Sequence, residues 1–110
     1  MTGYTCVGNV TDFRDGIVRV FPVDDLEIAV VSHEDRFYAF QGYCTHAAYS
    51  FNYTRVRPGA LILCSSHFAW FELATGKVLN GPASEDLARY QVRVEGGDVL
   101  VWTKPGDSGR

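Results

Sequence analysis

The sequence predicts a small all-β protein, and three observations support this class. The longest apolar stretches, residues 28–31 and 61–63, are no longer than single strands. Turn-forming residues separate such stretches at short intervals, which is typical of an antiparallel meander. Residues 89–95 alternate strictly between polar and apolar side chains, as a strand with one buried face does. The 110 residues can enclose one modest core, so we expect one domain built as a small sandwich or barrel.

The expected strands follow one another with clear turn residues between them. The first group spans residues 4–7, 17–21, 26–32 and 37–40, with Pro22 ending the second strand. The middle group spans residues 53–57, 61–63, 70–73 and 77–79, with turns at Pro58-Gly59 and Thr75-Gly76. The last group spans residues 89–95 and 99–103, joined by a hairpin turn at Gly96-Gly97-Asp98.

Two finer expectations concern the last third of the chain. In residues 89–95 the apolar members Tyr90, Val92 and Val94 should face the core, and the polar members should face water. Ser84 is the candidate N-cap of a single helical turn over residues 84–87.

Composition excludes several function classes. Lys and Arg number 10 against 13 Asp and Glu, a net charge of −3, so we expect no nucleic-acid partner. No stretch approaches the roughly 20 apolar residues of a membrane span. The first residues lack the basic start and apolar run of a signal peptide, so we expect a cytoplasmic protein with no membrane contact.

Cysteine and histidine residues form two mixed pairs in the middle of the chain. Cys44-Thr45-His46 is followed after 17 residues by Cys64-Ser65-Ser66-His67. Four such ligands on two loops can close a metal site, whereas three cysteines make a poor disulfide framework. His33 lies in a charged turn and Cys6 in a strand, and we expect structural roles for both, with Cys6 as a small buried thiol.

The ligand spacing leaves two metals open. Structural zinc sites pair like ligands locally, whereas each of these loops mixes one cysteine with one histidine. That mixture suits a two-iron centre in which both thiolates bind one iron and both imidazoles the other, so that each loop clamps both metals. On spacing alone, mononuclear zinc remains an alternative.

The residues around these pairs resemble a known family. The two pairs are followed by Phe71-Glu72-Leu73-Ala74-Thr75-Gly76-Lys77-Val78 and by Gly81-Pro82-Ala83. From about residue 16 to 103 the chain resembles Rieske [2Fe–2S] proteins, and in particular the soluble Rieske ferredoxins of bacterial multicomponent aromatic ring-hydroxylating oxygenases. The resemblance implies that Cys44 and Cys64 ligate the inner iron of one [2Fe–2S] cluster. It implies that His46 and His67 ligate the outer iron, and that residues 81–83 cover the cluster.

The resemblance also implies a domain organisation. A Rieske fold is an antiparallel β-sandwich base that carries a small inserted cluster-binding subdomain. We therefore expect a single domain over residues 1–110. Its cluster-binding subdomain covers about residues 41–83, which are rich in aromatic side chains. The basal sandwich covers about 4–40 and 84–103, and residues 104–110 form a loose tail.

Further positions predict the subtype. Quinol-oxidising Rieske proteins have an extra cysteine pair, and the matching positions here are Tyr49 and Ser66. Those proteins also donate two hydroxyls to sulfur atoms, and the matching positions here are Ala69 and Phe71. Donors to sulfur stabilise the reduced cluster, so their absence predicts a potential near the low end of the Rieske range, about −150 mV.

The sequence predicts an electron carrier and not an enzyme. It has no Gly-rich dinucleotide fingerprint and no evident nucleophile–base pair. We expect a monomer that takes electrons from an NAD(P)H-dependent flavoprotein reductase and passes them to a terminal aromatic ring-hydroxylating dioxygenase. Donation to a diiron monooxygenase and a role as the small subunit of an assimilatory reductase are alternatives. A zinc-stabilised interaction module is the alternative from a different class.

Overall fold

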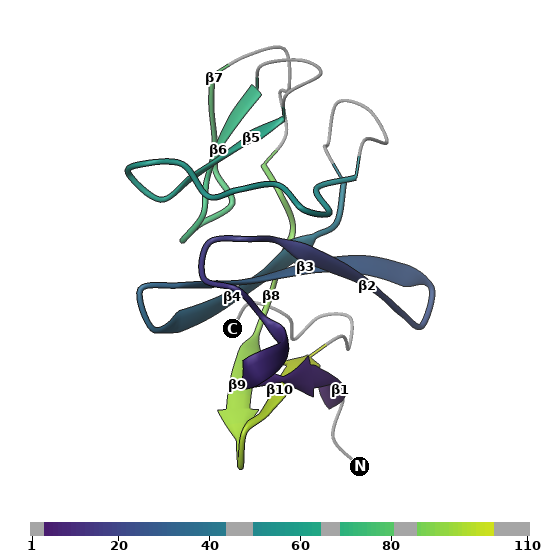
Figure 1. Cartoon of the computed structure of the whole chain (residues 1–110). Helices are drawn as coiled ribbons and strands as arrows, with labels where there is room; N and C mark the ends of the chain where they lie inside the picture. The colour runs from purple at the N-terminus through teal and green to yellow at the C-terminus, as the bar shows by residue number, and fades with distance from the viewer. Residues whose placement is uncertain (1–3, 44–49, 65–68, 81–85, 103–110) are drawn as a thin grey trace.

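Three antiparallel sheets form three stacked layers in the computed structural model of the chain (Figure 1). The structure describes residues 4–43, 50–64, 69–80 and 86–102. Within these ranges no helix is long and apolar enough to cross a membrane. The all-β antiparallel fold expected from the sequence is confirmed.

Each layer is a short sheet. The first has the order β1 (Tyr4–Asn9), β10 (Asp98–Trp102), β9 (Val92–Glu95). The second has the order β2 (Arg19–Val23), β3 (Leu26–His33), β4 (Arg36–Gln41), β8 (Arg89–Tyr90). The third has the order β5 (Leu61–Cys64), β6 (Ala69–Glu72), β7 (Val78–Asn80). A 3₁₀ turn, η1 (Val10–Asp12), follows β1 and is capped by the Asn9 side chain.

The second sheet is the middle layer, and β3 explains why. Its residues Ile28, Ala29, Val30 and Val31 are all fully buried. Because successive side chains in a strand point to opposite faces, Ile28 and Val30 join the core shared with β10. Ala29 and Val31 join the core shared with the third sheet. An uninterrupted apolar run is thus the signature of a strand covered on both faces.

Pro22 does not end the second strand, contrary to the sequence prediction. It lies inside β2 and pairs with Glu27 of β3. Proline cannot donate a ladder hydrogen bond, but β2 is an edge strand of its sheet and has only one neighbour to satisfy. β2 therefore ends at Val23, two residues later than predicted.

The alternating segment 89–95 is two strands and not one. β8 pairs with β4 in the middle sheet, whereas β9 pairs with β10 in the first sheet. The chain changes sheet at Gln91, whose carbonyl accepts a hydrogen bond from the Trp102 N–H at 2.8 Å. Tyr90 and Val92 are half-buried as expected, but Val94 is 45 % exposed because β9 is an edge strand that extends past the core. The turn at Gly96-Gly97 is confirmed, with φ values of 58° and 89°.

Residues 53–57 also depart from the prediction of a strand. They make isolated bridges and single hydrogen bonds to residues 16–18 and to Leu61, such as the bond from the Val18 N–H to the Thr54 carbonyl at 2.8 Å. Tyr53 has φ of 69°, which interrupts the extended backbone. The predicted helical turn over residues 84–87 lies largely outside the described residues, and Leu87 is irregular and buried.

Candidate metal centre

One of the four expected ligands lies in the described part of the chain. Cys64 is the last residue of β5, and it is 4 % exposed. Cys44, His46 and His67 lie outside the described residues, as do residues 81–83. Among the described residues no three His, Cys, Asp or Glu side chains group closely enough to hold a metal.

The described ends of the ligand-bearing segments lie on one side of the middle sheet (Figure 1). Cys64 pairs with Ala69 across β5 and β6, which brackets the segment that carries His67. Tyr43 and Ser50 form an isolated antiparallel bridge, which brackets the segment that carries Cys44 and His46. The fold thereby anchors both mixed Cys/His segments at their two ends.

Gln41 positions the stem of the Cys44 segment, and the sequence did not suggest this role. Its Nε2 donates to the Tyr43 carbonyl at 2.9 Å, and its Oε1 accepts from the Ala88 N–H at 2.7 Å. The next residue, Gly42, is buried, and a Cβ there would lie 2.8 Å from the Glu27 carbonyl oxygen. The only sequence signal for these contacts is a Gln-Gly pair after an apolar strand.

An apolar core lies against Cys64. Phe71 is fully buried in the same cluster, and its ring lies 6.1 Å from that of Phe51 in an edge-to-face arrangement. Phe71 thus lies in the core, whereas its neighbour Trp70 is only half-buried. Neither aromatic ring carries a hydroxyl, so these two side chains offer no O–H donor to a sulfur atom.

The Thr75-Gly76 turn fastens the third sheet to the rest of the molecule. The Leu87 N–H donates to the Gly76 carbonyl at 2.7 Å. Gly76 has φ of 77°, and a Cβ there would lie 2.5 Å from the Leu87 carbonyl oxygen. The Thr75 hydroxyl donates to Glu72 Oε1 at 2.6 Å and accepts from the Lys77 N–H at 3.2 Å. The motif is therefore a structural one, and it lies at the end of β6 away from Cys64.

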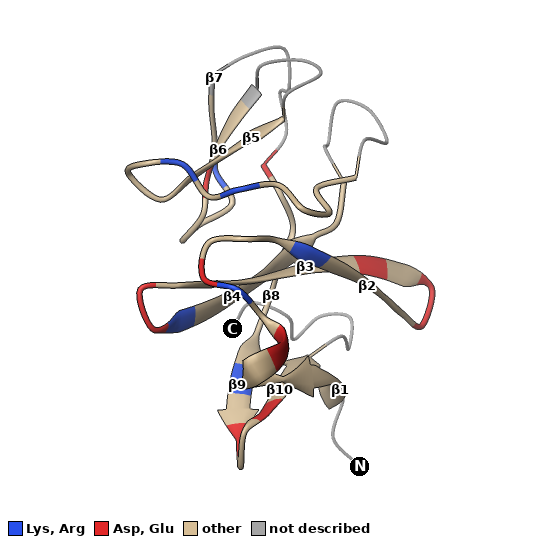
Figure 2. Ribbon diagram, in the orientation of Figure 1, with Lys and Arg blue, Asp and Glu red and all other residues tan. Residues whose placement is uncertain are grey.

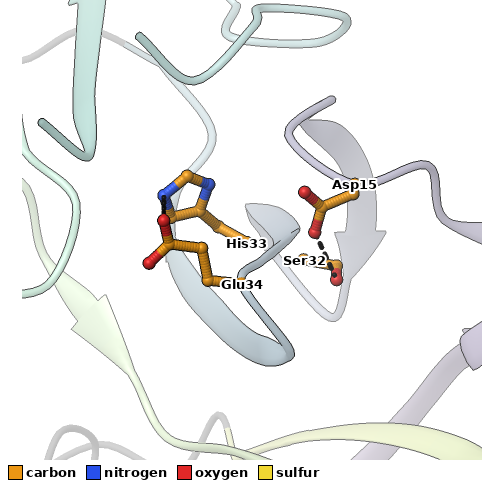
Figure 3. Close-up of polar contacts among 4 residues, drawn as sticks. All are labelled: Asp15, Ser32, His33 and Glu34. Atoms are coloured by element: carbon orange, nitrogen blue, oxygen red, sulfur yellow. Dashed lines mark hydrogen bonds and ion pairs between the residues drawn. The ribbon is translucent and has the colours of Figure 1, made fainter. Parts of the chain in front are cut away.

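The residues set aside as structural lie away from these segments. His33 ends β3, and its Nε2 lies 3.8 Å from Glu34 Oε2 beside a Ser32 hydroxyl that donates to Asp15 at 3.4 Å (Figure 3). The expectation that Cys6 is buried is wrong, because the residue is exposed. Cys6 pairs with Leu100, which alternates with the buried Val99 and Val101, so Cys6 faces outward.

The donor set fits a [2Fe–2S] cluster. Two thiolates and two imidazoles are the ligands that a Rieske centre uses. Cys64 ends a strand in a buried, apolar setting, which suits a ligand of an iron shielded from water. Cys44, His46, Cys64 and His67 are thus the residues that could hold such a group.

Comparison with known proteins gives the same result. The Rieske [2Fe–2S] domain family matches residues 3–91. The chain is 35 % identical over 102 residues to the ferredoxin component of the alkene monooxygenase system of Xanthobacter autotrophicus, covering 93 % of this chain and 83 % of that protein. It is 37 % identical over 78 residues to the biphenyl dioxygenase ferredoxin subunit of Pseudomonas sp. strain KKS102, covering 71 % and 72 %.

A solved structure is also similar. The ferredoxin in a complex of reduced oxygenase and oxidised ferredoxin of carbazole 1,9a-dioxygenase superposes with a TM-score of 0.82 at 27 % identity, covering 93 % of this chain and 94 % of that one. Fold, donor residues and relatives therefore agree, and this chain belongs to the Rieske [2Fe–2S] family and carries one Rieske-type cluster.

Proposed function

We propose that this protein is a low-potential Rieske ferredoxin that carries single electrons to a terminal oxygenase and is not itself an enzyme. The observation that carries the proposal is the pair of mixed Cys/His motifs in a chain whose residues 3–91 match the Rieske domain. The relatives named above are ferredoxin components or subunits of oxygenase systems, which supports the role of a carrier.

Cys44 and Cys64 would bind the inner iron, and His46 and His67 the outer iron. The cluster supplies reversible one-electron reduction when it is bound. Burial of Cys64 among apolar side chains shields its thiolate from water. Phe71 and Ala69 stand where hydroxyl donors to sulfur would otherwise raise the potential, so we expect about −150 mV.

The domain organisation follows the same division. Residues 1–110 form one Rieske domain whose cluster-binding subdomain covers about 41–83. The sheet of β5, β6 and β7 lies within those residues and supports this division. The basal sandwich of about 4–40 and 84–103 contains the other two sheets. Residues 104–110 are the tail.

The partners are a flavoprotein reductase, which reduces the ferredoxin, and a terminal oxygenase, which oxidises it. A related ferredoxin has been solved in complex with the oxygenase of carbazole 1,9a-dioxygenase, which supports the second partner. A carrier that visits two partners in turn is best served by a small, monomeric protein in the cytoplasm. The net charge of −3 gives no support to a nucleic-acid partner.

The terminal oxygenase has two candidate classes. An aromatic ring-hydroxylating dioxygenase is favoured by the biphenyl and carbazole systems of the relatives. A monooxygenase is favoured by the similarity to the alkene monooxygenase ferredoxin, because that alignment covers 93 % of this chain and the alignment with the biphenyl dioxygenase ferredoxin covers 71 %. NADH-driven turnover with the purified terminal oxygenase separates the classes: a cis-dihydrodiol from an aromatic substrate indicates the first, and an epoxide from an alkene indicates the second.

Spectroscopy tests the carrier role before any partner is known. We expect two irons and two sulfides per chain, and a rhombic EPR signal after dithionite reduction whose average g lies below that of four-cysteine clusters. Cys64→Ser should abolish the signal, whereas Cys6→Ser, at an exposed thiol away from the ligand segments, should retain it. One zinc per chain with no sulfide would contradict the proposal and favour the interaction module.

A further inference from the structure

Four arginines and an exposed tyrosine lie on two chain segments that pair with each other. We call this surface the arginine face, and it consists of Arg14, Arg19, Tyr53, Arg55 and Arg57. In Figure 2 its basic segments gather before and along β2 and along the irregular segment that precedes β5. The surface is unexpected in a protein whose net charge is −3.

Backbone pairing brings the two segments of the arginine face together. Ile17 and Arg55 form an antiparallel bridge, and the Tyr53 N–H donates to the Val18 carbonyl at 2.7 Å. Val18 is fully buried, so its neighbours Ile17 and Arg19 point to the outer side. A cavity of about 320 Å³ opens there, lined by Asp12, Arg14, Ile17, Arg19 and Tyr53.

The four guanidinium groups have no carboxylate partner among the described residues. The ion pairs within that part of the chain are His33–Glu34 and Arg93–Glu95. Two carboxylates lie close in the sequence, but Asp12 Oδ2 accepts from the Asn9 N–H at 2.9 Å. Asp15 Oδ1 accepts from the Ser32 hydroxyl at 3.4 Å. The arginines outnumber these acids, so the face attracts negative charge.

Tyr53 lies in a turn in which the Thr54 N–H donates to the Phe51 carbonyl at 2.9 Å. Its φ of 69° is costly for a bulky side chain, yet the side chain is 68 % exposed and so adds little to the core. The Arg19 guanidinium carbon lies 5.8 Å from the Tyr53 ring centroid, a cation–π distance. Strained backbone concentrates at functional surfaces. Tyrosine and arginine are also the residues that dominate binding energy at protein interfaces.

The arginine face adjoins the end of β5 that lies opposite Cys64. Arg57 bridges to Leu61, the first residue of β5, and Cys64 is the last. At a rise of about 3.3 Å per residue, the two ends of this strand are about 10 Å apart. A small transient interface buries about 600 Å² per partner, a patch roughly 28 Å across. A docked protein that contacts Arg57 can therefore also reach the Cys64 end of β5.

We propose that the arginine face is the docking surface for an acidic, carboxylate-bearing face of a protein redox partner. This inference rests on the proposed carrier role and adds the chemistry of the partner. Arginine side chains form directional, bidentate ion pairs with carboxylates, and the surface of an acidic protein presents such carboxylates. The arginines are spread over two chain segments and three of them are exposed, which favours a broad protein surface over a small anion.

Charge reversal tests the docking surface in each half-reaction separately. The double variant Arg55→Glu/Arg57→Glu is compared with Arg89→Glu, an exposed arginine on β8 at the opposite edge of the middle sheet from β2. Stopped-flow absorbance follows reduction by the host's reductase and oxidation by the host's terminal oxygenase.

At low ionic strength we expect the double variant to lose about tenfold in the second-order rate of electron transfer with at least one partner. The salt dependence of that rate should flatten. The control should change by less than about twofold.

Tyr53→Asn supplies a second, independent variant. Asparagine tolerates a positive φ better than tyrosine, so the melting temperature should stay equal or rise. The rate with the same partner should nevertheless fall, because the aromatic anchor is lost. A destabilised Tyr53→Asn variant with an unchanged rate would show that the tyrosine serves the fold alone.

Two results would overturn the inference and leave the carrier role standing. One is an unchanged rate of both variants with both partners, while the wild-type protein transfers electrons normally. The other is saturable, micromolar binding of sodium pyrophosphate to the wild-type protein that Arg55→Glu/Arg57→Glu abolishes, which would indicate a small-anion site. If the wild-type protein accepts no electrons from any reductase, the proposed function itself fails.

Discussion

The backbone around position 76 accepts only glycine. Its φ of 77° disfavours any side chain, and the space for a Cβ is filled by the Leu87 carbonyl oxygen at 2.5 Å. Gly96 has a comparable φ of 58°, but no atom lies within 4 Å of the position of its Cβ. The two glycines therefore separate the cost of backbone conformation from the cost of a clash.

Gly76→Ala should destabilise the protein by at least about 2 kcal/mol, because conformational strain and the clash add. Gly96→Ala should cost only about 1 kcal/mol, from the conformation alone. Urea unfolding followed by circular dichroism gives both values. Equal losses at the two positions would show that the contact with Leu87 adapts without cost.

Tyr90 makes stability sensitive to alkaline pH. Burial raises the pKa of Tyr90 above its ordinary value of 10.0, and the neighbouring Tyr43 raises this pKa further. The neutral phenol is thus favoured in the folded state. This contribution is complete below about pH 10 and is lost as the pH rises through the higher folded-state pKa.

We therefore expect the urea midpoint of the wild-type protein to fall as the pH rises above about 10. Tyr90→Phe should make this fall shallower, and Tyr43→Phe should do so to a smaller extent. Urea titrations at several pH values provide the measurement. An identical pH dependence in the wild type and in Tyr90→Phe would contradict the assignment.

At the scale of elements, the hairpin between β3 and β4 shows how a sequence can depart from ideal turn chemistry. Glu34 and Asp35 have φ values of 52° and 68°, the geometry of a two-residue turn that asparagine and glycine usually occupy. The turn is formed because Val30 and Val31 pair with Ala39 and Tyr38 around it. Packing of the strands thus overrides the local preference.

Asp35→Gly should stabilise the protein by about 1 kcal/mol, because it removes the steric cost of a left-handed residue. Arg36→Gly, one residue later in the extended strand β4, should instead cost roughly 0.5–1 kcal/mol. Thermal unfolding of the two variants tests the pair. A loss of stability in Asp35→Gly would mean that the carboxylate itself holds the turn.

The strands were predicted best where hydrogen bonds run between neighbours in the sequence. β3, β4 and β5 begin and end within one residue of their predicted bounds. The errors occur where a distant strand decides the outcome. β2 tolerates Pro22 because it is an edge strand, and the alternating segment 89–95 divides because its halves pair with β4 and β10.

At the scale of the whole molecule, we expect the third sheet to depend on the cluster more than the other two sheets do, because β5 carries the proposed ligand Cys64. It consists of three short strands, whereas the first two sheets share a core of their own around Val30 and Val101. Metal ligation contributes directly to folding where the bound site does not exist in the unfolded chain. We therefore expect the cluster to add to the stability that the third sheet gains from the core it shares with the middle sheet.

Removal of the cluster by acid and chelator should lower the melting temperature and expose the third sheet first. Hydrogen exchange is expected to accelerate at the amides of Phe71 and Leu73. The amides of Val99 and Val101 in β10 should remain protected, which provides the internal control. Uniform acceleration across both regions would show that the layers unfold as one unit.

The chemistry of this protein is local in its sequence, and its geometry is not. Two motifs of three and four residues predict the ligands, and strand-length apolar runs predict the fold class, because both depend on neighbours in the chain. The contact between Gln41 and Ala88 joins residues 47 positions apart, and the arginine face joins residues 14–19 to residues 53–57. Only tertiary packing creates such surfaces, since no periodic pattern records which distant segments will meet.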